Sequence, residues 1–200
     1  LDVGCGFGRL GPFLLQADVC KTYTGIDIAD SIIKCSENYL DVSIKESNDL
    51  EKIQTFFSNG NITDETRNIV AKDVQVILDS LKNKALEKSK KQSVDYRDRI
   101  KLSQGDVRKL SFDSESFDCV ISNEVLQNID YKDAILGCRE MARVSRSTIV
   151  LLERWSFPSE HSEPHIWSHN YSQIFSDLGL EVLQVTTINQ GLQGIVVRKR

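Results

Sequence analysis

Four glycines lie within the first eleven residues of the chain, directly after a short apolar segment. They are Gly4, Gly6, Gly8 and Gly11, out of 11 glycines in 200 residues. Glycines at the end of a strand allow a tight turn and let backbone N–H groups approach a ligand closely. The opening therefore predicts a strand at 1–3, a ligand-binding loop, and a helix over 10–17.

The same strand-then-helix rhythm continues along the chain, which favours a mainly parallel sheet with helices on both faces. Strands are predicted at 23–28, 100–103, 117–122 and 148–153, with helices starting at about Asp30 and spanning 131–144. The end differs, because a helix at 171–178 precedes strands at 181–188 and 194–198 that suit an antiparallel hairpin. We predict an α/β fold with a doubly wound, mainly parallel seven-stranded sheet and an antiparallel C-terminal hairpin.

A segment at about 41–98 interrupts this rhythm, since connections in such folds usually have 2–6 residues. It contains a capping-box pattern, Asn48 with Glu51, and a helical apolar face that follows Asp64. We expect a helical insertion into one domain that spans 1–200. By topology it joins the sheet at the edge opposite the glycine loop, so we expect a cover for the sheet or a contact surface for a protein or a second copy.

Composition excludes several classes of protein. The chain carries 25 Lys and Arg against 29 Asp and Glu, a net charge of -4, which disfavours nucleic acid as a partner. No apolar run approaches the roughly 18 residues that a membrane helix needs. The five cysteines are widely spaced and fit neither a disulfide framework nor a metal site, so we predict a cytoplasmic protein without a bound metal.

Two acids follow later strands in the same way that the glycines follow the first. Asp27 ends the second predicted strand, where a carboxylate can accept hydrogen bonds from both hydroxyls of a ribose. Asp106 follows the third strand in Gln-Gly-Asp-Val. The run from Gly6 to Gly11 also satisfies the GxGxxG pattern of dinucleotide sites, so these glycines alone leave a nicotinamide cofactor open.

The ordered motifs LDVGCGFG, GID, QGDV and SFDCVISNEVL resemble those of class I S-adenosylmethionine-dependent methyltransferases, over about 1–40 and 99–200. The resemblance implies S-adenosylmethionine as cofactor and S-adenosylhomocysteine as product. It implies that Asp27 holds the ribose, that Asp106 and Val107 meet the adenine, and that Asn123 faces the sulfonium. The residues implied to bind cofactor are Asp2, Gly4, Cys5, Gly6, Gly8, Arg9, Asp27, Ile28, Asp106, Val107 and Asn123.

The chain departs from the family pattern in two places. Leu126-Gln127-Asn128-Ile129 stands where relatives often have LEHI, which removes an acid and a histidine near the expected acceptor. Val144-Ser145-Arg146-Ser147 replaces the usual Pro-Gly-Gly turn before the fifth strand. The chain also starts inside a predicted strand without Met, so we expect a segment upstream.

The acceptor should lie at the carboxyl ends of the strands, near the segment 155–170. This segment holds all three histidines and both tryptophans, which favours an aromatic-walled pocket containing a base. His165 and Glu124 are the candidate catalytic residues. We expect an oxygen or nitrogen of a small molecule, or of a protein, as methyl acceptor. Two alternatives stay open: a non-catalytic methyltransferase-like binding module and an NAD-dependent oxidoreductase.

Overall fold

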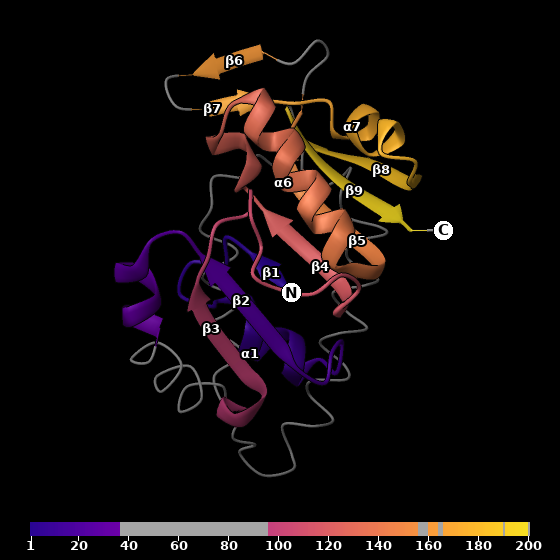
Figure 1. The fold of residues 1–200 in the computed structure, drawn as a ribbon. Coiled ribbons are helices and arrows are strands. Elements are labelled where there is room, and N and C mark those ends of the chain that lie inside the picture. The colour runs from indigo at the N-terminus through magenta and orange to yellow at the C-terminus, as the bar shows by residue number, and fades with distance from the viewer. Residues whose placement is uncertain (37–95, 156–159, 164–165, 190, 200) are drawn as a thin grey trace.

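The sheet of seven strands organises the fold. The computed structural model describes residues 1–36, 96–155, 160–163, 166–189 and 191–199. The strand order is β3-β2-β1-β4-β5-β9-β8 (Figure 1). The strands are β1 (Asp2–Val3), β2 (Tyr23–Asp27), β3 (Ile100–Gln104), β4 (Phe117–Asn123), β5 (Ser145–Arg154), β8 (Glu181–Asn189) and β9 (Leu192–Arg198).

Strands β1 to β5 are parallel to one another, and β9 pairs antiparallel with both β5 and β8. This topology confirms the predicted α/β fold and its antiparallel C-terminal hairpin. Strand order reverses between β1 and β4, which lie side by side although more than a hundred residues separate them. In open α/β sheets, such a reversal opens a crevice for ligands outside the carboxyl ends of the strands.

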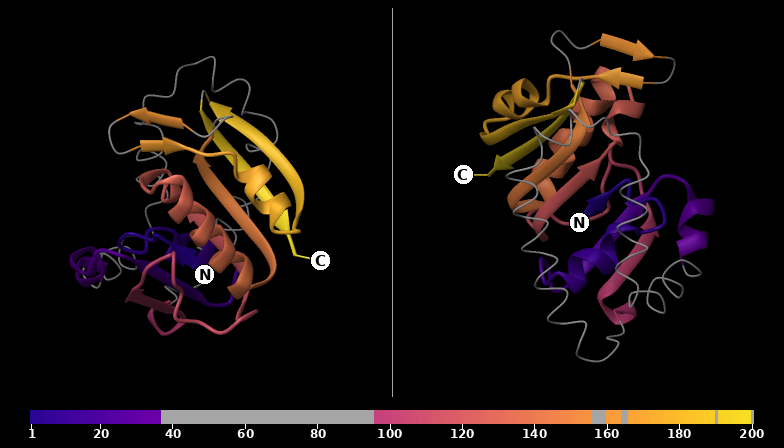
Figure 2. Two further views of the ribbon diagram at one scale, coloured as in Figure 1. Left: turned by 45° about the horizontal axis from the view of Figure 1, so that its top comes forward. Right: turned by 180° about the vertical axis from the view of Figure 1, so that it is seen from behind.

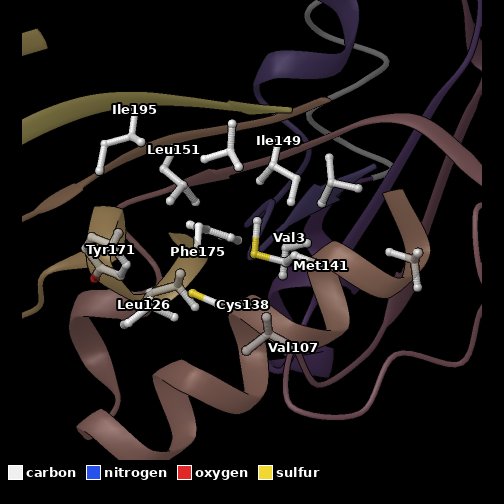
Figure 3. Close-up of a cluster of buried hydrophobic side chains, with 14 of the residues drawn as sticks. Val3, Val107, Leu126, Cys138, Met141, Ile149, Leu151, Tyr171, Phe175 and Ile195 are labelled. Carbon is white, nitrogen blue, oxygen red and sulfur yellow. The ribbon is translucent and has the colours of Figure 1, made fainter. Parts of the chain in front are cut away.

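Helices cover both faces of the sheet, because neighbouring side chains of a strand point to opposite faces. On one face, α1 (Leu10–Gln16) packs Leu15 against Tyr23 of β2. On the other face lie α6 (Tyr131–Val144) and α7 (Tyr171–Asp177) (Figures 1 and 2). The larger core fills the space between these two helices and the central strands (Figure 3); its fully buried members include Met141, Ile149, Leu151, Phe175 and Ile195.

The helix α6 has the bounds that the sequence predicts, 131–144. Asp130 caps its start, since the Asp130 side chain accepts a hydrogen bond of 3.0 Å from the Asp133 N–H. The helix runs into β5 without a connecting residue, because Ser145 already pairs with Phe117 of β4. The register of the pairing between β4 and β5 shifts between Phe117 and Cys119, close to the point where the helix passes into the strand. The fifth strand therefore begins three residues earlier than the predicted 148–153.

A second, two-stranded sheet forms within the segment 155–170, which the sequence did not predict. It pairs β6 (Glu160–Glu163) antiparallel with β7 (Ile166–Ser168), beyond the carboxyl ends of the main strands (Figure 1). Both strands are too short for an alternating pattern to reveal them. Short 3-10 turns, η1 (Arg97–Arg99) and η2 (Leu126–Asn128), precede β3 and α6. The predicted insertion at 41–98 lies outside the described residues except for its last three.

A matched pair of leucines tests where the core lies. Leu151 in β5 is fully buried, whereas Leu183 in β8 is 44% exposed. Leu151→Ala should lower the free energy of unfolding by about 2–5 kcal/mol, because it leaves a cavity against α6 and α7. Leu183→Ala should cost less than about 1 kcal/mol, and urea titration measures both. Equal losses in the two variants would contradict the assigned core.

Candidate functional site

The carboxyl ends of β1, β2, β3 and β4 bring the predicted site residues to one edge of the sheet. The glycine loop follows β1, Asp27 ends β2, Asp106 follows β3, and Asn123 ends β4. Parallel pairing sets these ends side by side, as the pairs of Val3 with Ile26 and with Ser122 show. The topology therefore gathers one residue set from four separate stretches of sequence.

Glycine is required in the loop for two different reasons. Gly4 has φ +70° and lies against Val125, so that an added Cβ would be 2.2 Å from Val125 Cγ2. Gly6 has φ +57°, but nothing lies within 4 Å of where its Cβ would be. Gly4 thus lets two loops approach each other, and Gly6 leaves room beside the backbone at the mouth of the crevice.

Asp27 is held by two backbone N–H groups. Its Oδ2 accepts from the Gly6 N–H at 2.9 Å, and its Oδ1 accepts from the Ala29 N–H at 2.9 Å. A carboxylate offers about four acceptor positions, so each oxygen keeps one for a ligand. The helical segment 30–36 begins at Asp30, where the sequence predicts a helix to start, and Asp30 pairs with Lys34 at 2.5 Å.

Asp2 lies beneath the loop and is 2% exposed. Its carboxyl group accepts a short hydrogen bond from the Tyr23 hydroxyl on the neighbouring strand. Burial raises the pKa of Asp2 to about 6, and the Tyr23 hydrogen bond and the nearby Arg9 oppose this rise. The Tyr23 contact gives Asp2 a supporting position under the glycine loop, since it joins β1 to β2.

The other predicted residues of the first two strand ends differ in exposure. Cys5 is buried against Gly25, and burial raises the pKa of its thiol to about 12. Gly8 has φ +82° and packs on Leu102. Arg9 is exposed at the start of α1, and Ile28 is 62% exposed beside Asp27. An isoleucine this exposed offers an apolar surface at the edge where a ligand would lie.

Asp106 already has a partner in the structure. Both of its carboxylate oxygens accept from the Arg108 side chain at 2.6–3.0 Å, and Arg108 also bonds Asp133 at 2.6 Å. These hydrogen bonds lower the pKa of Asp106 below its ordinary value. A ligand amine at Asp106 must therefore share the carboxylate with Arg108, a competition that the sequence does not reveal. Val107 beside it is buried.

The end of β4 presents polar groups to the crevice. Within the described part of the chain, the buried Oδ1 of Asn123 has no hydrogen-bond partner. Buried acceptors are almost always satisfied, so this atom suits a donor from a ligand or from water. The next residue, Glu124, is exposed and has φ +56°, a left-handed conformation that costs a non-glycine residue about 1–2 kcal/mol. Its strained backbone turns its side chain out at the edge of the sheet.

Glu153 is the residue that the sequence analysis missed. It is fully buried at the end of β5, and its Oε1 accepts from the Ser122 hydroxyl at 2.6 Å and the Val125 N–H at 3.0 Å. Its Oε2 accepts from the Gln127 N–H at 3.3 Å. Burial raises its pKa to about 7, although these hydrogen bonds lower it. The available signal was an acid at the end of an apolar strand, since Glu is almost never fully buried unless paired.

The structure describes the side-chain surroundings of one of the three histidines, His169. His169 is fully buried, bonds the Ile129 carbonyl through Nε2 at 3.0 Å, and stacks on Trp167 at 6.4 Å between ring centres. Burial lowers its pKa, which favours the neutral ring. His165 lies outside the described residues, and His161 is in β6. The described residues therefore place one of the three histidines in the protein interior.

Across the described ranges, no group of three or more His, Cys, Asp or Glu side chains is arranged to hold a metal ion. None of the helices in those ranges is long and apolar enough to cross a membrane. All five cysteines are free thiols, so the structure contains no disulfide.

Comparison with known proteins agrees with this geometry. A model of the methyltransferase domain family matches residues 57–151, which include β3, β4 and α6. Over these residues the chain is similar to the methyltransferase domain family. Comparison of the sequence with curated proteins gave no significant match.

Solved structures share the fold of this chain at low sequence identity. The PH0226 protein of Pyrococcus horikoshii OT3 has a TM-score of 0.59 and 14% identity, covering 100% of this chain and 80% of that one. Magnesium protoporphyrin IX methyltransferase of Synechocystis PCC 6803 with bound SAM has a TM-score of 0.56 and 13% identity, and the match covers 100% of this chain and 68% of that one. A chain of the complex between the Haloferax volcanii Trm112 methyltransferase activator and a methyltransferase has a TM-score of 0.61 and 15% identity. The match covers 98% of this chain and 80% of that one.

Two glycine variants of the protein separate packing from backbone strain. Gly4→Ala should lower the free energy of unfolding by about 2–5 kcal/mol, because its Cβ meets Val125 and its φ is strained. Gly6→Ala, with a similar φ and open space, should cost about 1 kcal/mol from strain alone. Urea unfolding without ligand measures both, and a loss at Gly6 equal to that at Gly4 would contradict the contact.

The buried carboxyl of Glu153 predicts a pH dependence of stability. Below pH 4.5 it is protonated in both the folded and the unfolded chain. Between pH 4.5 and 7 the unfolded chain loses the proton while the folded chain keeps it, so the free energy of unfolding falls by about 3 kcal/mol. Glu153→Gln does not titrate, so its free energy of unfolding relative to the wild type should rise by that amount across this range. A difference independent of pH would refute the prediction.

Proposed function

We propose that the chain is an S-adenosylmethionine-dependent methyltransferase that moves a methyl group to an oxygen or nitrogen of a small-molecule acceptor, or of a protein. The observation that carries the proposal is Asp27. Its two oxygens are held by the Gly6 and Ala29 N–H groups at the end of β2, beside the glycine loop, and each keeps an acceptor position. This arrangement suits the two neighbouring hydroxyls of a ribose.

Different residues at the edge of the sheet are proposed to bind different parts of the cofactor. Gly4, Gly6 and Gly8 shape the loop on the methionine and ribose side, with Cys5 and Arg9 beside them and Asp2 supporting them from below. Ile28 supplies an apolar surface for the adenine, while Asp106 accepts from its amine and the Val107 N–H donates to its ring. Asn123 directs its unpartnered oxygen toward the reacting centre.

The bound cofactor supplies an electrophilic methyl group on a positively charged sulfur. Transfer is an in-line displacement, so the protein contributes chiefly by orientation, which can be worth about 7–11 kcal/mol. Glu124 is exposed at the edge of the sheet and is our candidate to accept the proton that an oxygen or nitrogen acceptor loses. A general base adds about 10²–10⁴-fold. His165 is the second candidate, and its position lies outside the described residues.

The remaining proposals concern partners and location. The net charge of -4 argues for a small molecule or a protein as acceptor rather than nucleic acid. The insertion at 41–98 is proposed as a contact surface for a protein or a second copy within one methyltransferase domain. Five free thiols support a cytoplasmic location.

Titration with S-adenosylhomocysteine tests the proposed cofactor site. Asp27→Ala should weaken binding by about 100-fold or more, because two hydrogen bonds to a charged group contribute about 1.5–3 kcal/mol each. Asp30→Ala is the matched control. It removes the same charge three residues after Asp27, from a carboxylate that forms an exposed ion pair with Lys34. Its dissociation constant should stay within about twofold of the wild-type value, as measured by calorimetry.

Two further measurements separate the alternatives. Tighter binding of NAD than of S-adenosylhomocysteine would favour an oxidoreductase and overturn the proposal. Incubation with methyl-labelled S-adenosylmethionine and a panel of small molecules and proteins then tests turnover. Cofactor binding without transfer of label to any of them would favour a non-catalytic binding module.

A further inference from the structure

Glu153 holds the segment that connects β4 to α6. Three donors of that segment meet its carboxyl group, namely the Ser122 hydroxyl and the Val125 and Gln127 N–H groups. Two of these donors belong to the backbone of the turn after β4. Without the carboxyl, these N–H groups would be buried and unpaired, which a folded chain avoids. Glu153 therefore determines the conformation of this turn from the neighbouring strand.

The turn contains the two residues proposed to act at the acceptor. Asn123 and Glu124 lie between Ser122 and Val125, which are both bonded to the same Glu153 oxygen. The Glu124 N–H also donates to the Leu152 carbonyl at 2.8 Å, one residue before Glu153. Hydrogen bonds thus hold the backbone of Glu124 and its neighbours on both sides while Glu124 is in the left-handed conformation. Strained conformations persist where the surroundings determine them in this way.

The same turn reaches the glycine loop. Val125 donates its N–H to Glu153 and packs its side chain on Gly4, where a Cβ would come within 2.2 Å of Cγ2. A displacement of Val125 would therefore remove the wall against which Gly4 lies. One carboxyl group is in this way connected to both the acceptor edge and the cofactor loop.

The surroundings of Glu153 offer hydrogen bonds rather than an opposite charge. The Cys138 thiol of α6 and the Tyr171 phenol of α7 lie close enough for its charge to raise their pKa values. Gln193 of β9 is its partner in the sheet register. All three groups are uncharged at neutral pH. The donors of Ser122, Val125 and Gln127 are thus what orients this carboxyl group.

We propose that Glu153 is a positioning residue for methyl transfer, which fixes the turn 122–127 and through it both the acceptor edge and the glycine loop. The proposal rests on the proposed function. It assigns to Glu153 no contact with substrate or cofactor, since it is fully buried beneath the turn.

The test compares three variants at a temperature where each is folded. Glu153→Leu keeps the approximate volume without an acceptor, Glu153→Gln keeps the length and one carbonyl oxygen, and Ile195→Ala removes a fully buried side chain of the same core. Amide hydrogen exchange at Val125 and Gln127 and the dissociation constant for S-adenosylhomocysteine are measured for each.

Glu153→Leu should speed exchange at both amides by more than about tenfold and weaken S-adenosylhomocysteine binding by about tenfold. Glu153→Gln keeps an acceptor for only one of the two amides, because Val125 and Gln127 bond different oxygens of Glu153. Exchange should therefore stay within about threefold of the wild-type value at one amide and speed up at the other, with a loss of affinity smaller than that of Glu153→Leu. Ile195→Ala should lose stability with unchanged exchange at these amides and unchanged affinity. If Glu153→Leu behaves like Ile195→Ala, Glu153 is only a core residue and the proposal is overturned.

Two outcomes of this experiment need a further comparison. Should Glu153→Leu fail to fold, Glu153→Asp replaces it, because its carboxyl is one methylene too short to reach the turn; equal exchange in the Asp and Gln variants would overturn the proposal. If the wild-type protein does not bind S-adenosylhomocysteine, the proposed function fails. The exchange measurement then still decides whether Glu153 holds the turn.

Discussion

The packing of Val125 on the backbone of Gly4 is the constraint on which the edge of the sheet depends. It exists because β1 and β4 are parallel neighbours, so the segments that leave them start at the same height. Any side chain at position 4 would force these two segments apart. The glycine loop, Asp27 and the end of β4 can form one crevice only while this contact is kept, since Asp27 is bonded to the same loop through Gly6.

Buried acids support this edge from below. Asp2 and Glu153 are both nearly or fully inaccessible, and each is bonded to a neighbouring strand or turn rather than to a cation. Such groups are costly to bury, and burial raises the pKa of both. These carboxyl groups fix the orientation of the neighbouring backbone, because a carboxyl group accepts hydrogen bonds only along its lone pairs. An apolar side chain would permit several arrangements of the same turn.

Much of the fold could be predicted from the sequence because local signals coincide with tertiary ones. Helix α6 has its predicted bounds, since Asp130 supplies a cap and the apolar spacing that follows matches the buried face. The β6–β7 hairpin was missed because its strands have four and three residues. Among site residues, the sequence singled out Asp27 but not its two backbone donors. The partners of Glu153 could not be predicted because they lie about thirty residues away in the sequence, although an acid at the end of an apolar strand was a signal for the residue itself. The Arg108 hydrogen bonds to Asp106 depend on side-chain conformations that the sequence pattern does not show.

The hairpin of β6 and β7 shares no ladder with the seven-stranded sheet. It touches the rest of the molecule through β5, η2 and the buried His169, so its outer strand has no register to maintain with the main strands. A change in the length of this hairpin therefore alters no pairing of the main sheet, but it can reach the end of β4 through the contacts of β7 with η2.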